Sequence, residues 1–393
     1  FDPTLPMVSL DLSRALSVTK VTVNGTRPAQ FRAAMGKLHI TLTERLPAGA
    51  AMTIAIRYGG NPRPIRSLWG EVGFEELTEG VLVAGQPNGA SSWFPCDDHP
   101  SAKASFRVQI ATESPYFALA NGKLLAKRAR AGMTTWVYEQ AEPTSTYLMT
   151  LQVGVYDRHR MAKNGVEIFA VLPARLRTAF DHDFGRQPQM MKLFMELFGP
   201  YPLATGYTVV VTDDDLEIPL EAQGISIFGA NHCDGKRGSE RLIAHELAHQ
   251  WFGNSVTVQR WRHIWLHEGF ACYAEWLGSE HCGERTADEW ARHYHHRLKN
   301  SAQNLVLADP GPRDMFDDRV YKRGAITLHA LRLRIGDGNF FALLHRWTDK
   351  YRYGSVTTED FMALAATHSS KPLKDLWDDW LFTPELPPFP GPS

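Results

Sequence analysis

The stretch His245-Glu246-Leu247-Ala248-His249, followed after eighteen intervening residues by Glu268, decides how this chain is interpreted. Residues four apart lie on one face of a helix, so both imidazoles can point at one ion. Zinc in hydrolases commonly takes three protein ligands and keeps a fourth position open. Glu246 adjoins the first ligand and can act as general base on a water there. The pattern predicts a zinc hydrolase.

The residues around the motif favour two helices. Ser239 is a suitable N-cap, and Leu242, Ile243 and Leu247 give the first helix an apolar side. Gly253-Asn254 can end that helix and let the chain return as a second helix carrying Glu268. The alternative to a metal site is a buried salt bridge between helices.

Further from the motif, the chain changes character near residue 155. Before it, short runs alternate apolar and polar residues, as in 18–23, which ends at the hairpin signal Asn24-Gly25. After it, long segments carry apolar residues at three- and four-residue spacing, including 176–197 and 319–334. We therefore expect an α+β chain, with an antiparallel β-rich domain over 1–155 and a mainly helical catalytic domain over 156–393.

The composition of the chain does not point to a class of partner, so its function has to be inferred from a specific site. The chain has 393 residues, and 42 Lys and Arg nearly balance 43 Asp and Glu, so no charge run favours nucleic acid or an anionic membrane. No apolar run is long enough for a membrane span. Four cysteines in a chain of this size suggest reduced, buried thiols, with a Cys272–Cys282 pair as the alternative.

The motif in its full context resembles the gluzincin aminopeptidases of the aminopeptidase N type, peptidase family M1. The resemblance rests on 245–254, on Trp265-Leu266-His267-Glu268-Gly269-Phe270-Ala271 and on their spacing, and it extends over nearly the whole chain. It implies a saddle-like β domain before a thermolysin-like domain, and one zinc ion held by His245, His249 and Glu268. His267 stands where the family usually has Asn.

Three further residues take their roles from the resemblance. Tyr321, in 320–325, matches the tyrosine that stabilises the tetrahedral intermediate; otherwise it is an ordinary helix residue. Glu221 matches the glutamate that binds the substrate's amino group, although Ile218-Pro219-Leu220-Glu221-Ala222 departs from the family's GxMEN loop. Gln86 matches a β-domain residue placed against the same amine. Without the resemblance, Glu221 would be a solvated loop carboxylate, and Gln86 carries no signal.

Other polar residues are weaker candidates. Glu275, on the helical face of Glu268, and Asn254 could orient the histidines through their second ring nitrogens, or be plain capping or surface residues. The cluster His293, His295 and His296 is expected to be a solvated helix face.

The predicted function is removal of N-terminal amino acids from peptides by attack of water that zinc and Glu246 activate. The alternatives are a zinc endopeptidase of the thermolysin-like class, a bifunctional epoxide hydrolase, and a catalytically silent peptide-binding scaffold. The expected partners are peptides with a free N-terminus, and we expect a cytoplasmic monomer. The resemblance further implies a short form without the family's large C-terminal helical domain.

Overall fold

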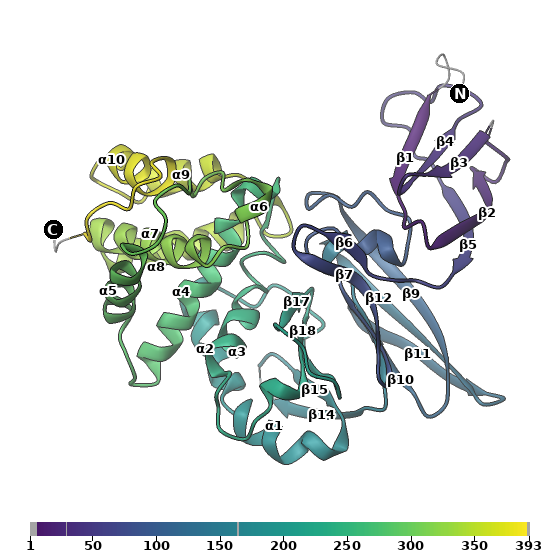
Figure 1. Ribbon diagram of the computed structural model, residues 1–393, viewed down its shortest axis with the longest axis horizontal. Coiled ribbons are helices and arrows are strands. Elements are labelled where there is room, and N and C mark those ends of the chain that lie inside the picture. Colours follow the sequence, from purple (N-terminus) through teal and green to yellow (C-terminus); the bar gives the residue numbers. More distant parts are fainter. Residues whose placement is uncertain (1–5, 29, 163–164, 391–393) are drawn as a thin grey trace.

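The chain folds into a β-rich first part and a mainly helical second part, as the sequence predicts (Figure 1). The computed structural model describes residues 6–28, 30–162 and 165–390. Figure 1 shows β1 to β5 as a lobe at the N-terminal end, well separated from the helices α4 to α10. The boundary near residue 155 stays a prediction.

The first part consists of antiparallel strands, and it is organised in sheets with the orders β1-β4-β3, β2-β5, β10-β13-β8-β7-β6 and β11-β12-β9. The strands are β1 Met7–Asp11, β2 Leu16–Val23, β3 Gln30–Ala34, β4 Lys37–Thr41, β5 Ile54–Gly60, β6 Ile65–Ser67, β7 Gly70–Leu77, β8 Gly80–Ala84, β9 Lys103–Glu113, β10 Phe117–Ala120, β11 Lys123–Arg130, β12 Met133–Ser145 and β13 Leu151–Gly154. Alternating burial, as along β12, reflects one face turned to the core.

The hairpin expected at Asn24-Gly25 is only partly present. Both residues have positive φ (50° and 81°), and Val23 and Thr26 exchange backbone hydrogen bonds across the turn. The chain does not continue as a hairpin, because β2 pairs with β5 instead of β3. Strand β3 instead joins β4 in a two-residue hairpin through Met35 and Gly36, a turn that lacks the Asn-Gly signal.

The second part begins with a mixed sheet in the order β14-β15-β16-β18-β17. Its strands are β14 Asp157–Ala162, β15 Ile168–Leu172, β16 Tyr207–Val211, β17 Leu220–Ala222 and β18 Ile225–Phe228, while β19 Thr257–Val258 pairs with β20 Ser355–Val356. The helices are α1 Arg177–Asp183, α2 Gln187–Phe198, α3 Glu240–Ala248, α4 Trp265–His281, α5 Ala287–Leu298, α6 Gly311–Asp314, α7 Asp318–Ile335, α8 Asp337–Lys350, α9 Thr358–Ala366 and α10 Lys374–Trp377.

The single helix suggested for 176–197 is wrong, because the chain forms α1 and α2 with a break at Phe184-Gly185-Arg186. The apolar spacing continues across the break, since Phe180, Phe184 and Met190 all enter one core. Asp183 is the last residue of α1, and its side chain makes tertiary contacts there. It accepts hydrogen bonds from the backbone N–H groups of Gly235 (2.7 Å) and Arg237 (2.9 Å).

Two apolar cores position the site. The larger one fills the second part and buries Trp251, Trp265 and Trp276 completely or nearly so. A smaller one joins the two parts, with Trp136 and Tyr138 of β12 against Val210 of β16 and Ile225 of β18. This shared core fixes the β-rich part relative to the metal-binding helices. Within the described residues, no helix is long and apolar enough to cross a membrane.

Candidate metal centre and active site

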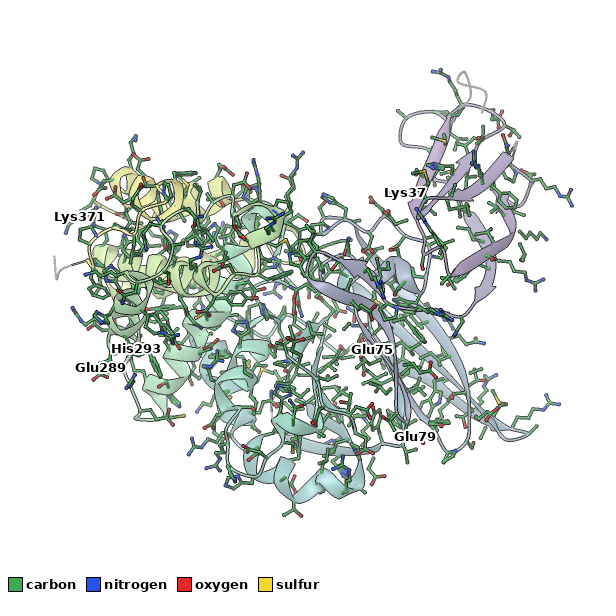
Figure 2. All side chains as sticks on the ribbon, in the orientation of Figure 1. Lys37, Glu75, Glu79, Glu289, His293 and Lys371 are labelled. Atoms are coloured by element: carbon green, nitrogen blue, oxygen red, sulfur yellow. The ribbon has the colours of Figure 1, made fainter. Side chains whose placement is uncertain are left out.

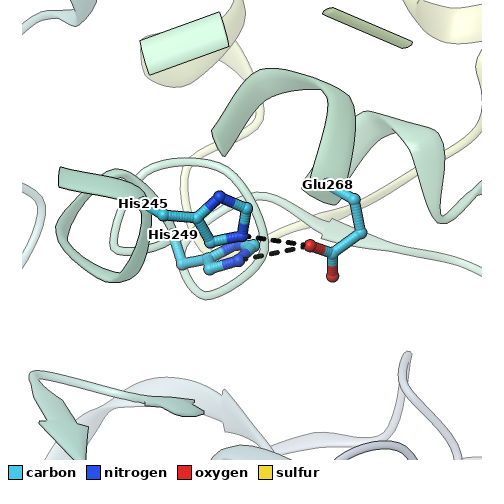
Figure 3. A group of neighbouring side chains, drawn as sticks. All are labelled: His245, His249 and Glu268. Carbon is cyan, nitrogen blue, oxygen red and sulfur yellow. Dashed lines mark hydrogen bonds and ion pairs between the residues drawn. The ribbon is translucent and has the colours of Figure 1, made fainter. Parts of the chain in front are cut away.

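Helix α3, with His249 as the residue directly after it, and helix α4 bring the three predicted metal ligands together (Figure 3). Nε2 of His245 lies 3.3 Å from Oε2 of Glu268, and Nε2 of His249 lies 3.5 Å from the same oxygen. All three residues are buried, and their ligand atoms lie within 4.8 Å of one another. Two imidazoles and one carboxylate form a common catalytic zinc ligand set.

The electrostatics of the triad fit a cation at its centre. Although burial opposes it, hydrogen bonds with Glu268 and Glu275 raise the pKa of His245 to about 8. Burial likewise opposes protonation of His249, but Glu221 and Glu268 raise its pKa to about 10. The surrounding carboxylates thus favour positive charge on the imidazoles, and a divalent ion would supply that charge instead.

The second ring nitrogen of each histidine is also held. His245 Nδ1 lies 2.7 Å from Oε1 of Glu275, and Arg241 donates from Nη1 to both oxygens of Glu275 (3.0 and 3.2 Å). His249 Nδ1 lies 2.9 Å from the carbonyl oxygen of Phe252. Such contacts fix the orientation of metal-binding imidazoles. No role for Arg241 is predicted from the sequence, although its position four residues before His245 places it on the same helical face.

The environment of Glu246 suits a general base. It is buried, and its Oε2 has no hydrogen-bond partner among the described residues. Burial raises its pKa above the usual value, against the effect of His245 and His249. A buried oxygen without a partner needs an explanation in a native structure, and a water positioned at the metal centre would provide one.

Glu221 lies on the edge strand β17 and not in a loop. One of its oxygens forms a second compact group with Glu246 and His249, whose ligand atoms are also within 4.8 Å of one another. Gln86, from the segment after β8, donates from Nε2 to Oε1 of Glu221 (2.7 Å). Burial raises the pKa of Glu221 to about 8, and a cation bound beside it would lower that pKa and favour the ionised carboxylate.

Strand β17 is braced against the end of the metal helix by residues that the sequence did not assign there. Gln250 accepts from the N–H of Gly224 (2.8 Å) and donates to the carbonyl of Ala222 (3.2 Å). Asn254 donates to the same carbonyl (2.8 Å). Asn254 therefore positions the strand of Glu221, whereas the sequence suggested that it orients a histidine.

Tyr321 is carried on α7 to the metal centre by a close crossing of two helices. A Cβ on Gly269 of α4 would lie 2.9 Å from the backbone of Gly324 of α7, so both positions require glycine. The crossing stacks the Tyr321 ring on that of His245, with centroids 5.9 Å apart. Burial and the neighbouring carboxylates, Glu268 foremost, raise the pKa of Tyr321 well above its usual value. The phenol therefore remains a hydrogen-bond donor.

His267, which stands where the resembling family usually has Asn, does not disturb the metal centre. The ring is buried, and Nε2 accepts a hydrogen bond from the backbone N–H of Val258 (2.9 Å). Burial lowers the pKa of His267 to about 3, so it is neutral. His267 thus fixes the loop entering α4 without placing a second charge beside Glu268.

The remaining sequence candidates lie away from the centre. All four cysteines are free, and Cys282 is exposed while the other three are buried. Figure 2 shows His293 at the outer edge of α5, and it is exposed together with His296. His295 is buried instead, with Nε2 2.8 Å from the carbonyl oxygen of Pro387. The solvated face predicted for this cluster is therefore wrong for His295.

Comparison with known families gives two matches. The peptidase M1 N-terminal domain matches residues 8–148, and the peptidase family M1 domain matches residues 183–380. Aminopeptidase M1-B of Oryza sativa subsp. japonica is 28% identical over 314 residues, which are 73% of this chain and 35% of the relative. Aminopeptidase N of Lactococcus lactis subsp. lactis is 26% identical over 75% of this chain and 38% of its own length. The chain thus spans about a third of the length of these relatives.

A solved structure is similar over much more of its length. An M1 zinc metallopeptidase from Deinococcus radiodurans is 30% identical, with a TM-score of 0.89, over 98% of this chain and 88% of that one. The similarity includes both the β-rich part and the helical part.

Proposed function

Because the chain belongs to peptidase family M1, we propose that it is a zinc aminopeptidase that removes N-terminal residues from peptides. The observation that carries this proposal is the carboxylate of Glu221, held by Gln86 at 2.7 Å beside the metal triad. A buried anion next to the reacting centre suits a substrate's α-ammonium and would limit cleavage to the first peptide bond.

The geometry supports the following proposed roles. His245, His249 and Glu268 hold zinc, which supplies Lewis-acid activation of water and of the scissile carbonyl when bound. Glu246 accepts the proton of the attacking water and passes it to the leaving amine. The phenol of Tyr321 donates a hydrogen bond to the oxygen that develops negative charge. Glu221 and Gln86 hold the ammonium.

Hydrolysis rates on aminoacyl arylamides, each with a free or an acetylated α-amine, test this function. We expect cleavage of the free amines only, abolished by a chelator and restored by zinc. Equal cleavage of acetylated substrates would favour an endopeptidase, and no cleavage by the zinc-loaded protein would favour a silent scaffold. A monomeric state and a cytoplasmic location stay predictions of the sequence.

A further inference from the structure

The loop that follows the metal helix contacts both a predicted metal ligand and the strand of Glu221. The carbonyl oxygen of Phe252 lies 2.9 Å from Nδ1 of His249. Two residues later, the side-chain amide of Asn254 donates to the carbonyl oxygen of Ala222 at 2.8 Å. Ala222 adjoins Glu221 on strand β17. The position of this short loop therefore affects how the imidazole is oriented and where the carboxylate of Glu221 lies.

The β-rich part holds this loop through two side chains. Lys103, the first residue of β9, donates from Nζ to the carbonyl oxygens of Asn254 (3.2 Å) and Ser255 (2.9 Å). The hydroxyl of Tyr147, which is buried, donates to the carbonyl oxygen of Gly253 at 3.4 Å. Successive carbonyls of the loop thus accept hydrogen bonds from the other part of the chain, and Lys103 supplies the two shorter ones.

Lys103 is an unexpected residue for this place. Its side chain is half-buried, and burial lowers the pKa of its ammonium to about 7. Within the described part of the chain, Nζ forms no ion pair with a carboxylate. A lysine that loses water without an anionic partner is costly, whereas a methionine of similar length would fill the same space without that cost. The two hydrogen bonds to the loop are therefore the physical reason for a nitrogen at this position.

We propose that Lys103 is a positioning residue for the amine-binding carboxylate of Glu221. By holding the carbonyls of Asn254 and Ser255, Lys103 fixes the backbone that carries the Asn254 amide. That amide in turn fixes Ala222, beside Glu221. This role rests on the proposed function, in which Glu221 binds the ammonium of the substrate. Lys103 acts on the carboxylate through Asn254.

The effect of Lys103 should be partial and confined to the amine side of the site. Gln250 also donates to the carbonyl of Ala222 (3.2 Å), so the strand keeps one brace when Lys103 is lost. The loop is also tied to the metal helix by its own backbone, because the N–H of Asn254 donates to the carbonyl of His249 (3.0 Å). We therefore expect weaker binding of a free amine, with little change in zinc affinity or in the turnover number.

Lys103→Met tests this role, because it removes Nζ and keeps an unbranched side chain. Lys123→Met changes an exposed lysine on β11 of the same sheet and is the matched control. Lys103→Arg keeps the donors, and Asn254→Ala cuts the next link of the route. Initial rates on a free-amine aminoacyl arylamide give KM and kcat for these variants and for the double variant of Lys103→Met with Asn254→Ala. Zinc affinity and melting temperature are measured for the same proteins.

A binding measurement separates this role from the peptidase activity. In the zinc-loaded Glu246→Gln protein, which we expect to turn over very slowly, calorimetry gives the Kd of leucinamide. N-acetylleucinamide, which lacks the ammonium, is the control ligand. The same titrations are then made after Lys103→Met is added to this background.

We expect Lys103→Met to raise both KM and the leucinamide Kd about 3- to 10-fold. The turnover number and the zinc affinity should stay within about threefold of wild type. Lys123→Met should match wild type, and Lys103→Arg should restore most of the loss. The double variant should raise KM no further than the larger single effect, because both changes cut one route.

An unchanged KM and Kd in Lys103→Met, even with a lower melting temperature, would overturn the positioning role, and so would KM effects that multiply in the double variant. Absence of leucinamide binding in the Glu246→Gln background would overturn it as well. If leucinamide binding depends on Lys103 but wild type cleaves no free-amine substrate, the peptidase function fails and the positioning role stands. If Lys103→Met does not fold, Lys103→Gln, whose side chain is shorter, replaces it in each comparison.

Discussion

The side chains of Gln86 and Glu221 meet across the junction of the two parts of the chain, with the amide of Gln86 donating to the carboxylate at 2.7 Å. Gln86 follows strand β8 of the β-rich part, and Glu221 lies on β17 beside the metal helix. Only one oxygen of Glu221 is used in this bond. The amide therefore orients the carboxylate while leaving its charge for another partner.

Loss of the Glu221 charge should affect only substrates with a free amine. Glu221→Gln keeps the shape of the side chain but removes the anion. Because hydrogen bonds to charged groups contribute about 1.5–3 kcal/mol, we expect kcat/KM on aminoacyl arylamides to fall about 10- to 100-fold. Acetylated substrates, which carry no ammonium and which we expect wild type not to cleave, should stay uncleaved by the variant. A kcat/KM on free-amine substrates within about twofold of wild type would contradict the role in amine binding.

Removal of the Gln86 amide should also weaken the use of free-amine substrates, but by less than loss of the Glu221 charge. In Gln86→Ala the Glu221 carboxylate remains but loses its orienting donor, so we expect KM for free-amine substrates to rise up to about tenfold. The turnover number should stay within about threefold, because Gln86 does not contact the attacking water in the proposed mechanism. Initial rates over a range of substrate concentrations separate the two constants, and a fall in kcat alone would be inconsistent with this assignment.

Glu246→Gln should separate metal binding from catalysis. Glu246 is not one of the three residues of the ligand triad, and glutamine cannot accept the proton. We expect full zinc occupancy by elemental analysis and a fall in kcat of about 10²- to 10⁴-fold. Glu113→Gln, an exposed position on β9, is the matched control. Substantial activity in Glu246→Gln would remove the general-base role.

Tyr321→Phe should lower kcat with little change in KM, because the phenol serves the developing oxyanion more than the bound substrate. Loss of one such donor costs about 10²- to 10³-fold. The ring stacked on His245 is retained, so the melting temperature should stay close to that of wild type. Burial and nearby carboxylates raise the pKa of Tyr321 well above its usual value of about 10. The wild-type kcat profile should therefore show no alkaline loss from this group up to pH of about 10.

The metal centre could be predicted from the sequence because its determinants are local. Helical spacing alone places His245 and His249 on one face, and the return of a second helix brings in Glu268. The contact between Gln86 and Glu221 depends on the core that joins the two parts, and no local pattern encodes it. The break between α1 and α2 was missed for a related reason. Both helices bury one continuous apolar pattern, and the tertiary contacts of Asp183 end the first.

Arg323 should be a major contributor to stability. Its buried guanidinium donates to the carbonyls of Asp379 (3.0 Å), Trp380 (3.0 Å) and Pro384 (2.6 Å) in the segment after α10. Arg323→Met would leave these oxygens without their donor, and we expect a loss of about 3–5 kcal/mol. The stability of Arg323→Lys should lie between those of wild type and Arg323→Met, because the lysine ammonium lacks the planar fork of donors that a guanidinium has. Urea unfolding measures both variants, and a Met variant within about 1 kcal/mol of wild type would refute this role.

Lys103 should make stability depend on pH above neutrality. This β9 residue donates from Nζ to the carbonyls of Asn254 (3.2 Å) and Ser255 (2.9 Å), directly after the metal helix. Burial lowers its pKa to about 7, whereas an unfolded lysine titrates near 10.4. Between pH of about 7 and about 10.4, Lys103 carries a proton in the unfolded chain but not in the folded chain. The contribution of Lys103 to the free energy of unfolding therefore grows as pH rises through this range, and it is lost as pH falls through about 7. Lys103→Met lacks the group. The unfolding free energy of wild type relative to this variant should therefore increase from pH of about 7 to about 9.5, as measured by urea unfolding of the metal-free proteins. A constant or decreasing difference would mean that Lys103 stays charged in the folded protein.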